Sequence, residues 1–325
     1  MYADTLRWVS ICAYLRHLRI VLLVRGLSME TKILDGNRVA EAMRAEMKAE
    51  IARLKKGHDL VPGLAVVLVG EDPASVSYVK GKRKACEEIG IHSVEHKFEA
   101  NLPEGDLLGL IDRLNADPKV HGILVQLPLP RQIDEQKVLL AIHPDKDIDG
   151  FHPVNVGKMV IGEEGYLPCT PHGIQQILLR SGVQVEGRHV VVVGRSNIVG
   201  KPIANILLQK KPGANATVTI CHTGTKDMAY FTRQADILIV AAGRPNTVTA
   251  DMVREGVVVV DVGVNRIPDA SKKSGFRLVG DVDFEGVKQK AGAITPVPGG
   301  VGPMTITMLL HNTVQSAKRH HGIER

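Results

Sequence analysis

The sequence has few aromatic residues. Phe, Trp and Tyr make up 3% of its 325 residues, whereas apolar residues together make up 44%, so its cores must be built mainly from aliphatic side chains. Cores of this kind, in a chain with 32 glycines, are typical of parallel sheets covered by helices on both faces rather than of β-sandwiches. We therefore predict an α/β protein.

Cysteine is also scarce. The four cysteines, Cys12, Cys86, Cys169 and Cys221, lie far apart without a CxxC motif, and the thirteen histidines are equally scattered. This dispersal excludes the usual zinc ligand sets, and we expect no metal site. Isolated thiols are typical of a reducing compartment, where they serve as small core residues.

A nucleic-acid-binding protein would be expected to carry a basic face interleaved with aromatic residues for stacking. The formal net charge is +6, and half of it comes from residues 1–28, which hold four arginines and one aspartate. We therefore expect no nucleic-acid partner, and a non-enzymatic basic binding module remains only as an alternative.

Long apolar runs are missing from the start of the chain. Within residues 1–28 the longest run, Ile20 to Val24, is too short for a membrane span or a signal-peptide core. We expect a cytoplasmic protein with no membrane partner, in which residues 1–28 form a poorly ordered extension ahead of a second start at Met29. The alternative is a mitochondrial transit peptide, because this segment is rich in arginine and poor in acidic residues.

Strand and helix patterns alternate from Asp35 onward. Apolar residues recur every three or four positions from Val39 to Leu54, which predicts a helix. Apolar and β-branched runs separated by helical segments then predict mostly parallel sheets with right-handed crossovers. The predicted strands cover residues 63–70, 91–98, 121–128, 188–194, 216–222, 235–243 and 256–263.

A stretch broken by proline and glycine, residues 150–171, divides this alternation into two domains. We predict an N-terminal αβα domain over residues 29–149 and a doubly wound, Rossmann-like domain over residues 150–302. A last helix, from about Pro303 to Lys318, is expected to return to the first domain, to which residues 303–325 are assigned.

The segment GRSNIVGKP follows a run of four valines and leads into a predicted helix. A strand, a glycine turn at Gly194 and a helix N-terminus make an anion site from backbone N–H groups, although the spacing departs from GxGxxG. The next strand ends in CHTGTK and lacks the carboxylate that holds an NAD ribose. Arg195, Thr223 and Lys226 could instead accept a 2′-phosphate, so NADP is favoured over NAD.

The segment SYVKGKRKACEEIG, residues 77–90, contains four cations in five positions. Wound as a helix, it places Lys82 on the inward stripe, one turn beyond Tyr78, whereas the other three cations form a solvated face with two glutamates. An inward lysine usually extends its ammonium to solvent. The strand ending in ILVQLPLP, however, brings Gln126 to the same crevice, where Lys82 could be its partner.

Two motifs in this region have other interpretations. Tyr78 and Lys82 match the Tyr-x-x-x-Lys pair of short-chain dehydrogenases, but those enzymes carry their glycine-rich turn before the pair, and here it follows. The segment DKDIDG is similar to half of an EF-hand loop, but the twelfth position is Val156 rather than glutamate. Asp149 could instead bind an amino-heterocycle, or serve as a turn or capping residue.

Together, these segments resemble the bifunctional methylenetetrahydrofolate dehydrogenase/cyclohydrolase family. The resemblance covers residues 32–318 and implies NADP-dependent oxidation of 5,10-methylenetetrahydrofolate to the methenyl cation. It also implies hydrolysis to 10-formyltetrahydrofolate in the same cleft, a role in one-carbon metabolism, and a homodimer formed through the cofactor domains. The matching motifs are VGEDPASVSYVKGKRKACEEIGI, HGILVQLPLP, HPDKDIDGFHPVNVGK, PCTPHGI, VVVVGRSNIVGKP, DVGVNR, GDVDFEGV and TPVPGGVGPMT.

The resemblance implies roles for individual residues. Lys82 is the implied central residue of hydrolysis, tuned by Gln126, while Tyr78 covers and orients the folate and Asp149 holds its pterin. The remaining implied substrate contacts lie in the closing loop at Pro298, Gly299 and Gly300. The implied cofactor contacts are Gly194, Arg195, Ser196, Thr223, Gly263 and Val264.

The chemistry of both steps agrees with these residue types. Loss of hydride from the methylene carbon leaves a cation stabilised by two nitrogens, so dehydrogenation requires orientation but no proton acceptor. Hydrolysis requires proton transfer, and a lysine becomes an effective base near neutral pH when burial lowers its pKa. The sequence is therefore not expected to contain a histidine relay.

Overall fold

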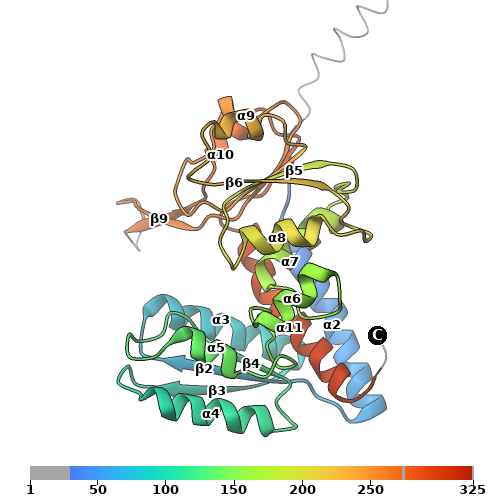
Figure 1. Ribbon diagram of the computed structural model, residues 1–325, viewed down its shortest axis with the longest axis vertical. Helices are drawn as coiled ribbons and strands as arrows, with labels where there is room; N and C mark the ends of the chain where they lie inside the picture. The colour runs from blue at the N-terminus through green and yellow to red at the C-terminus, as the bar shows by residue number, and fades with distance from the viewer. Residues whose placement is uncertain (1–29, 273–274, 324–325) are drawn as a thin grey trace, which may run out of the picture.

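The computed structural model describes residues 30–272 and 275–323, so the predicted extension at residues 1–28 lies outside the described residues. Two lobes, each built on a parallel sheet, lie one above the other (Figure 1). Three helices pack together between them: α2 (Gly36–His58), α7 (Cys169–Arg180) and α11 (Val301–His320). In the described part of the chain, no helix is long and apolar enough to cross a membrane.

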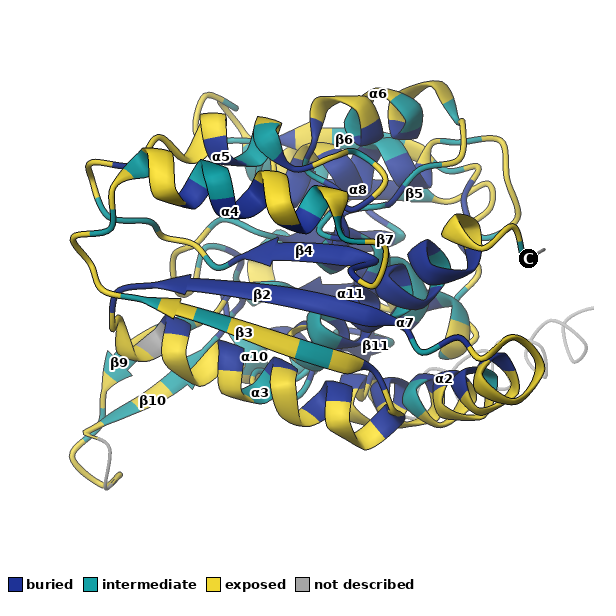
Figure 2. Ribbon diagram, turned by 90° about the horizontal axis from the view of Figure 1, so that it is seen from below, coloured by how far each residue is buried: buried dark blue, intermediate teal, exposed yellow. Residues whose placement is uncertain are grey.

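The first lobe contains a three-stranded parallel sheet with β2 at its centre. Its elements are β2 (Gly63–Val69), α3 (Pro73–Ile89), β3 (His92–Phe98), α4 (Glu104–Ala116), β4 (Gly122–Val125) and α5 (Glu135–Ala141). The strand order is β3–β2–β4, and β2 and β4 are buried while the edge strand β3 is largely exposed (Figure 2). Side chains of β2 alternate between two cores, since Leu64 and Val66 pack toward α2 and α3 and Ala65 and Val67 toward α4.

The second lobe contains a six-stranded sheet with the order β1–β11–β8–β7–β5–β6, parallel throughout. Its strands are β1 (Lys32–Ile33), β5 (His189–Val193), β6 (Thr217–Cys221), β7 (Ile237–Val240), β8 (Val258–Asp261) and β11 (Ala293–Ile294). The associated helices are α6 (Pro153–Ile161), α8 (Gly200–Leu207), α9 (Met228–Thr232), the 3-10 turn Ala250–Met252 and α10 (Phe284–Lys288). Both faces of β5 are buried, which explains its run of valines.

The predicted α/β fold with two sheets is confirmed, and so is the return of the last helix. α11 packs against α2 and α7 and reaches β2 and β4 of the first lobe. Asn312 on α11 donates hydrogen bonds to the carbonyl oxygens of Ile148 (2.8 Å) and Leu167 (3.1 Å). The last helix therefore fixes the connection between the two lobes.

Two features were not predicted from the sequence. β1 precedes α2 in the chain but pairs with β11 in the second sheet, through Lys32 opposite Ala293 and Ile33 opposite Ile294. An antiparallel hairpin of β9 (Asn265–Pro268) and β10 (Phe276–Val279) extends from the second lobe (Figure 1). Both are made of strands of two to four residues, which are too short to produce a clear alternation pattern.

Candidate active site

Lys82 lies on the buried face of α3, as its helical phase predicts. Its relative exposure is 9%, and its Nζ donates a hydrogen bond of 3.0 Å to Gln126 Oε1. The hydrogen bond to Gln126 was also expected, because a buried amide requires a partner. The buried neighbours on the same face are Ala85, Cys86 and Ile89, and the exposed cations are Lys80, Arg83 and Lys84.

Gln126 is held in position by the end of β4. Its backbone N–H extends the ladder by donating to Val67 O at 2.9 Å. Its side-chain nitrogen donates to Leu127 O at 2.7 Å, which leaves the amide oxygen directed at Lys82. The ammonium of Lys82 is thus located by α3 on one side and by β4 on the other.

Asp149 lies at the end of the junction between the lobes, beside Lys82. Desolvation raises the pKa of the Asp149 carboxyl, and the positive charge of Lys82 opposes this rise. The thiol of Cys169, at the start of α7, lies 3.8 Å from Asp149 Oδ1 and 3.4 Å from Ile148 O. A carboxyl in this environment can accept hydrogen bonds from a bound amino-heterocycle.

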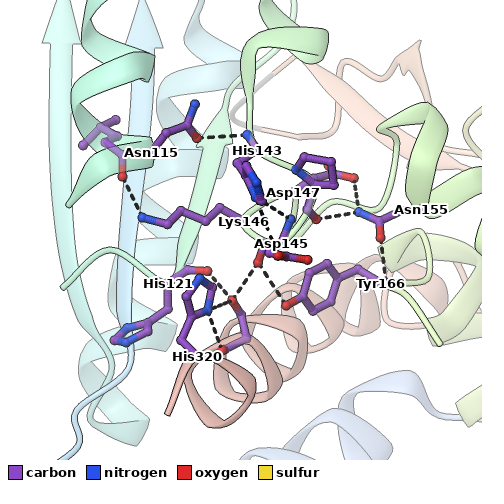
Figure 3. Close-up of polar contacts among 12 residues, drawn as sticks. Asn115, His121, His143, Asp145, Lys146, Asp147, Asn155, Tyr166 and His320 are labelled. Atoms are coloured by element: carbon purple, nitrogen blue, oxygen red, sulfur yellow. Dashed lines mark hydrogen bonds and ion pairs between the residues drawn. The ribbon is translucent and has the colours of Figure 1, made fainter. Parts of the chain in front are cut away.

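Polar contacts hold the DKDIDG loop that carries Asp149 (Figure 3). Asp147 Oδ2 accepts hydrogen bonds from the backbone N–H of His152 (2.8 Å) and from Asn155 Nδ2 (2.9 Å), and the Tyr166 hydroxyl donates to Asp145 O (3.0 Å). Asp147 therefore ties the DKDIDG loop to the start of α6. Within residues 30–272 and 275–323, no group of His, Cys, Asp and Glu is arranged to hold a metal ion.

Lys82, Gln126 and Asp149 line a single cavity of about 270 Å³. Most of the other lining side chains are apolar, apart from a few polar groups that include the hydroxyls of Thr170 and Thr305, 2.9 Å apart. Ile198 and Val199, which precede α8 in the second lobe, complete its wall. The cavity therefore lies between the two lobes, and both contribute side chains to it.

Tyr78 borders a second cavity, of about 360 Å³. Its side chain is 48% exposed, although helical phase places it on the same stripe as Lys82, because an open cavity rather than a packed element faces it. Asn37, which sequence reasoning missed, lies in the same wall, where the backbone N–H groups of Gly36 and Asn37 both donate to Gly299 O. The predicted residues in this cavity are Tyr78, Gly263, Val264, Pro298, Gly299 and Gly300.

A third cavity, of about 390 Å³, lies at the carboxyl ends of β6, β5 and β7. It contains four of the predicted cofactor residues, Gly194, Arg195, Ser196 and Thr223. Arg244, in the turn after β7, also lines it and was not predicted as a cofactor contact from the sequence. The predicted cofactor residues are thus divided between this cavity and the second one.

The glycine turn after β5 depends on the absence of side chains. Gly194 has a φ of +125°, and a Cβ there would lie 2.2 Å from Ala241 O. A Cβ at Gly200 would lie 2.2 Å from Gly194 O, so α8 approaches the strand end as closely as backbone atoms allow. This close approach brings the N-terminus of α8 next to the end of β5, where Ser196 Oγ accepts hydrogen bonds from the backbone N–H groups of Val199 (3.1 Å) and Gly200 (3.3 Å).

A buried aspartate holds the turn after β8. Asp261, at the end of β8, accepts hydrogen bonds from the backbone N–H groups of Gly263 (2.9 Å), Asp281 (2.9 Å) and Val282 (3.0 Å). Burial raises the pKa of Asp261 to about 6, and these hydrogen bonds oppose the rise. The cavity-lining turn at Gly263 is therefore held by a buried carboxyl group.

Comparison with known proteins agrees with this geometry. Residues 34–149 match the family model for the catalytic domain of tetrahydrofolate dehydrogenase/cyclohydrolase, and residues 168–321 match that for its NAD(P)-binding domain. The bifunctional protein FolD of Dehalococcoides mccartyi strain CBDB1 is 61% identical over 296 residues, which are 91% of this chain and 99% of that protein.

Solved structures agree as well. The bifunctional FolD enzyme of Campylobacter jejuni is 51% identical with a TM-score of 0.83, covering 89% of this chain and 99% of that one. The Trypanosoma brucei enzyme, solved with NADP cofactor and inhibitor, is 40% identical with a TM-score of 0.84, covering 89% of this chain and 98% of that one. The chain belongs to the tetrahydrofolate dehydrogenase/cyclohydrolase family.

Proposed function

We propose that the cavity around Lys82 carries out both reactions of this family. These are the oxidation of 5,10-methylenetetrahydrofolate to the methenyl cation and its hydrolysis to 10-formyltetrahydrofolate. The observation that carries the proposal is the shared wall of the first cavity, in which Lys82 and Asp149 face Ile198 and Val199 of the second lobe. A folate held beside Lys82 would therefore lie next to the domain with the nucleotide turn.

NADP is the cofactor that best fits the second lobe. Gly194 and Gly200 permit the tight turn from β5 into α8 at the edge of the third cavity, and no Asp or Glu lines this cavity to exclude a 2′-phosphate. The Trypanosoma brucei relative binds NADP in its crystal structure. When bound, NADP supplies the acceptor for the hydride that leaves the methylene carbon.

The residues of the first cavity have separate roles in this proposal. Asp149 holds the pterin through its amino groups, and Tyr78 covers the folate from the second cavity. In the hydrolytic step water adds to the methenyl carbon, the bond to N5 breaks, and protons move between the water and the ring nitrogen. Lys82, oriented by Gln126, is positioned to transfer these protons.

The domain assignment follows from the same roles. Residues 29–149 with residues 303–325 form the folate-binding catalytic domain, and residues 150–302 form the NADP-binding domain, to whose sheet β1 adds an edge strand. The supporting contacts are those of α11 with α2, β2 and β4. The loop at Pro298, Gly299 and Gly300 then closes over the substrate at the boundary between the two domains.

A direct assay tests the proposed reactions. NADPH absorbance is followed after mixing the protein with methylenetetrahydrofolate and either NADP or NAD, and the decay of the methenyl product is recorded separately. We expect faster reduction with NADP than with NAD, followed by hydrolysis of the product. If neither folate turns over, the proposal is wrong and a basic binding module becomes the better interpretation.

Replacing Lys82 tests its role in the hydrolytic step. We expect Lys82→Met to reduce methenyltetrahydrofolate hydrolysis by at least about a hundredfold, because proton transfer is lost, while NADP binding is retained. Lys80→Met on the exposed face of the same helix is the matched control and should leave hydrolysis unchanged. Hydrolysis at the wild-type rate in Lys82→Met would refute the role of Lys82.

We also propose a homodimer formed through the NADP-binding domains, as the family resemblance implies. Support comes from β6, which is an edge strand of the second sheet with Ile220 exposed, and from the exposed Tyr230 on the adjacent α9. Light scattering after size-exclusion chromatography should give about twice the chain mass of 35.3 kDa. A monomeric mass at assay concentrations would contradict this assembly.

The proposed location is a reducing compartment such as the cytoplasm. Cys86, Cys169 and Cys221 are free and buried, and burial raises the pKa of the Cys86 thiol to about 12. Such thiols serve as core residues rather than as disulfide partners. Labelling under native and denaturing conditions should show them protected only in the folded protein.

A further inference from the structure

The turn after β7 brings a second arginine to the cofactor cavity. Arg244 and Arg195 both line the third cavity, and no Asp or Glu lines it. Across residues 30–272 and 275–323, neither guanidinium group forms an ion pair with a carboxylate. Two cations that share a cavity without a counterion give it a positive potential, so it attracts an anion.

The backbone that carries Arg244 is held in place by neighbouring groups. Asp281 Oδ2 accepts hydrogen bonds from the backbone N–H groups of Ala242 and Gly243, both at 2.7 Å. Thr247 Oγ1 donates a hydrogen bond of 2.8 Å to Arg244 O. Because the turn is already ordered, a ligand that contacts Arg244 has only its side chain to immobilise.

The strand order places Arg244 across the cavity from the other predicted phosphate contacts. Thr223 follows β6, Arg195 follows β5, and Arg244 follows β7, and these strands are adjacent in the order β6–β5–β7. A dinucleotide with its diphosphate at Gly194 would place its adenosine half in this cavity. Cations then lie on two sides of that half of the cofactor.

We propose that Arg244 is a specificity-determining residue that contacts the 2′-phosphate of NADP, in addition to Arg195. The inference rests on the NADP use proposed above. An arginine binds a phosphate through charge-assisted hydrogen bonds, whereas NAD carries an uncharged hydroxyl at this position. Arg244 therefore contributes to the binding of NADP and little to that of NAD.

Two fragments of the cofactor isolate this contact. Adenosine 2′,5′-bisphosphate and 5′-AMP differ only in the 2′-phosphate, and their affinities are measured by calorimetry on the full chain. We expect Arg244→Gln to weaken the bisphosphate by about tenfold and to leave 5′-AMP nearly unchanged, because a charged hydrogen bond is lost. Arg244→Lys keeps the charge and should retain part of the affinity.

Matched variants complete the design. Lys211→Ala removes one exposed cation of the same lobe that does not line the cavity, and it should change neither affinity. Arg195→Ala provides the comparison for the phosphate contact already predicted. The ratio of kcat/KM for NADP to that for NAD should fall in Arg244→Gln by the same factor as the bisphosphate affinity.

Any other result of these binding measurements contradicts the proposed role of Arg244. Equal weakening of both fragments would mean that Arg244 contacts adenine or ribose, and no weakening would mean that it contacts no cofactor. If the wild-type protein binds both fragments equally, the preference for NADP fails together with this inference. If the wild-type protein prefers the bisphosphate and Arg244→Gln does so equally, only the role of Arg244 is wrong.

Discussion

Gln126 Oε1 is the hydrogen-bond acceptor that holds the buried Lys82 ammonium, at 3.0 Å. Desolvating a charged group is costly unless hydrogen bonds compensate, so this amide determines where the ammonium lies. The same amide is tied to Leu127 O and cannot rotate freely.

Replacing Gln126 by methionine removes this acceptor at nearly constant size. We expect Gln126→Met to lower kcat for hydrolysis by about tenfold or more, since the ammonium loses its orientation, and to leave the KM for NADP unchanged. Gln132→Met is the control, because Gln132 is exposed and its side chain donates to Ala100 O and Leu102 O. Equal effects of the two variants on hydrolysis would contradict the prediction.

Individual site residues differ in how well the sequence predicts them. Helical phase is a local property, and it places Lys82 inward without knowledge of the rest of the fold. Asn37 and Arg244 reach their cavities only through tertiary packing, the first because the Gly299 loop docks on α2 and the second because β7 lies beside β5. Neither arrangement leaves a signal in neighbouring residues.

Strands with long apolar runs were predictable from the sequence, whereas strands of two to four mixed residues were not. The buried strands β2, β5, β7 and β8 are apolar on both faces and have the long β-branched runs from which they were predicted. β1, β9 and β10 have two to four residues each and mix apolar with charged side chains. Their pairing is determined by partners distant in the sequence.

The turn between β5 and α8 gives a prediction about backbone conformation. We expect Gly194→Ala to lower the free energy of unfolding by about 3 kcal/mol and to weaken NADP binding. The φ of +125° at Gly194 is unfavourable for alanine, and the new Cβ would lie 2.2 Å from Ala241 O. Gly182→Ala is the control, with a φ of +75° and open space around its Cβ position.

Urea denaturation measures the loss of stability in Gly194→Ala, and cofactor titration measures the loss of NADP affinity. Gly182→Ala should lower the free energy of unfolding by about 1 kcal/mol, because only its backbone conformation is unfavourable, and it should leave NADP binding unchanged. A Gly194→Ala protein as stable as the control would show that the turn can move away from Ala241. The steric role of Gly194 would then be wrong.

The molecule as a whole contains a pH-dependent contact where α11 meets the first sheet. His121 accepts a hydrogen bond from Gly63 N–H at 2.9 Å through Nδ1, and its ring lies against those of His320 and His321. Desolvation, together with the nearby histidines, lowers the pKa of His121 to about 4, whereas the unfolded chain has the ordinary value of 6.5. The unfolded state therefore binds a proton that the folded state excludes between these values.

Stability should consequently decrease as pH falls from 6.5 toward 4. We expect His121→Asn, which can keep the acceptor for Gly63 N–H, to reduce this decrease, as measured by urea midpoints at pH 5 and pH 7. His92→Asn, at an exposed position on β3, is the control. The raised pKa values of Asp147 and Asp261, each about 6, act in the opposite direction, so the test is the difference between variant and wild type. An unchanged pH dependence in His121→Asn would refute the role of His121.

The pairing of β1 with β11 has a consequence for the order in which the protein can be assembled. Lys32 is among the first described residues of the chain, and its strand partner Ala293 comes close to the end. During synthesis, β1 cannot form this pairing until β11 has left the ribosome. Closing such a long loop is slow relative to local structure formation. Completion of this sheet should therefore be a late event in folding, and nascent chains that end before β11 should lack the pairing of β1.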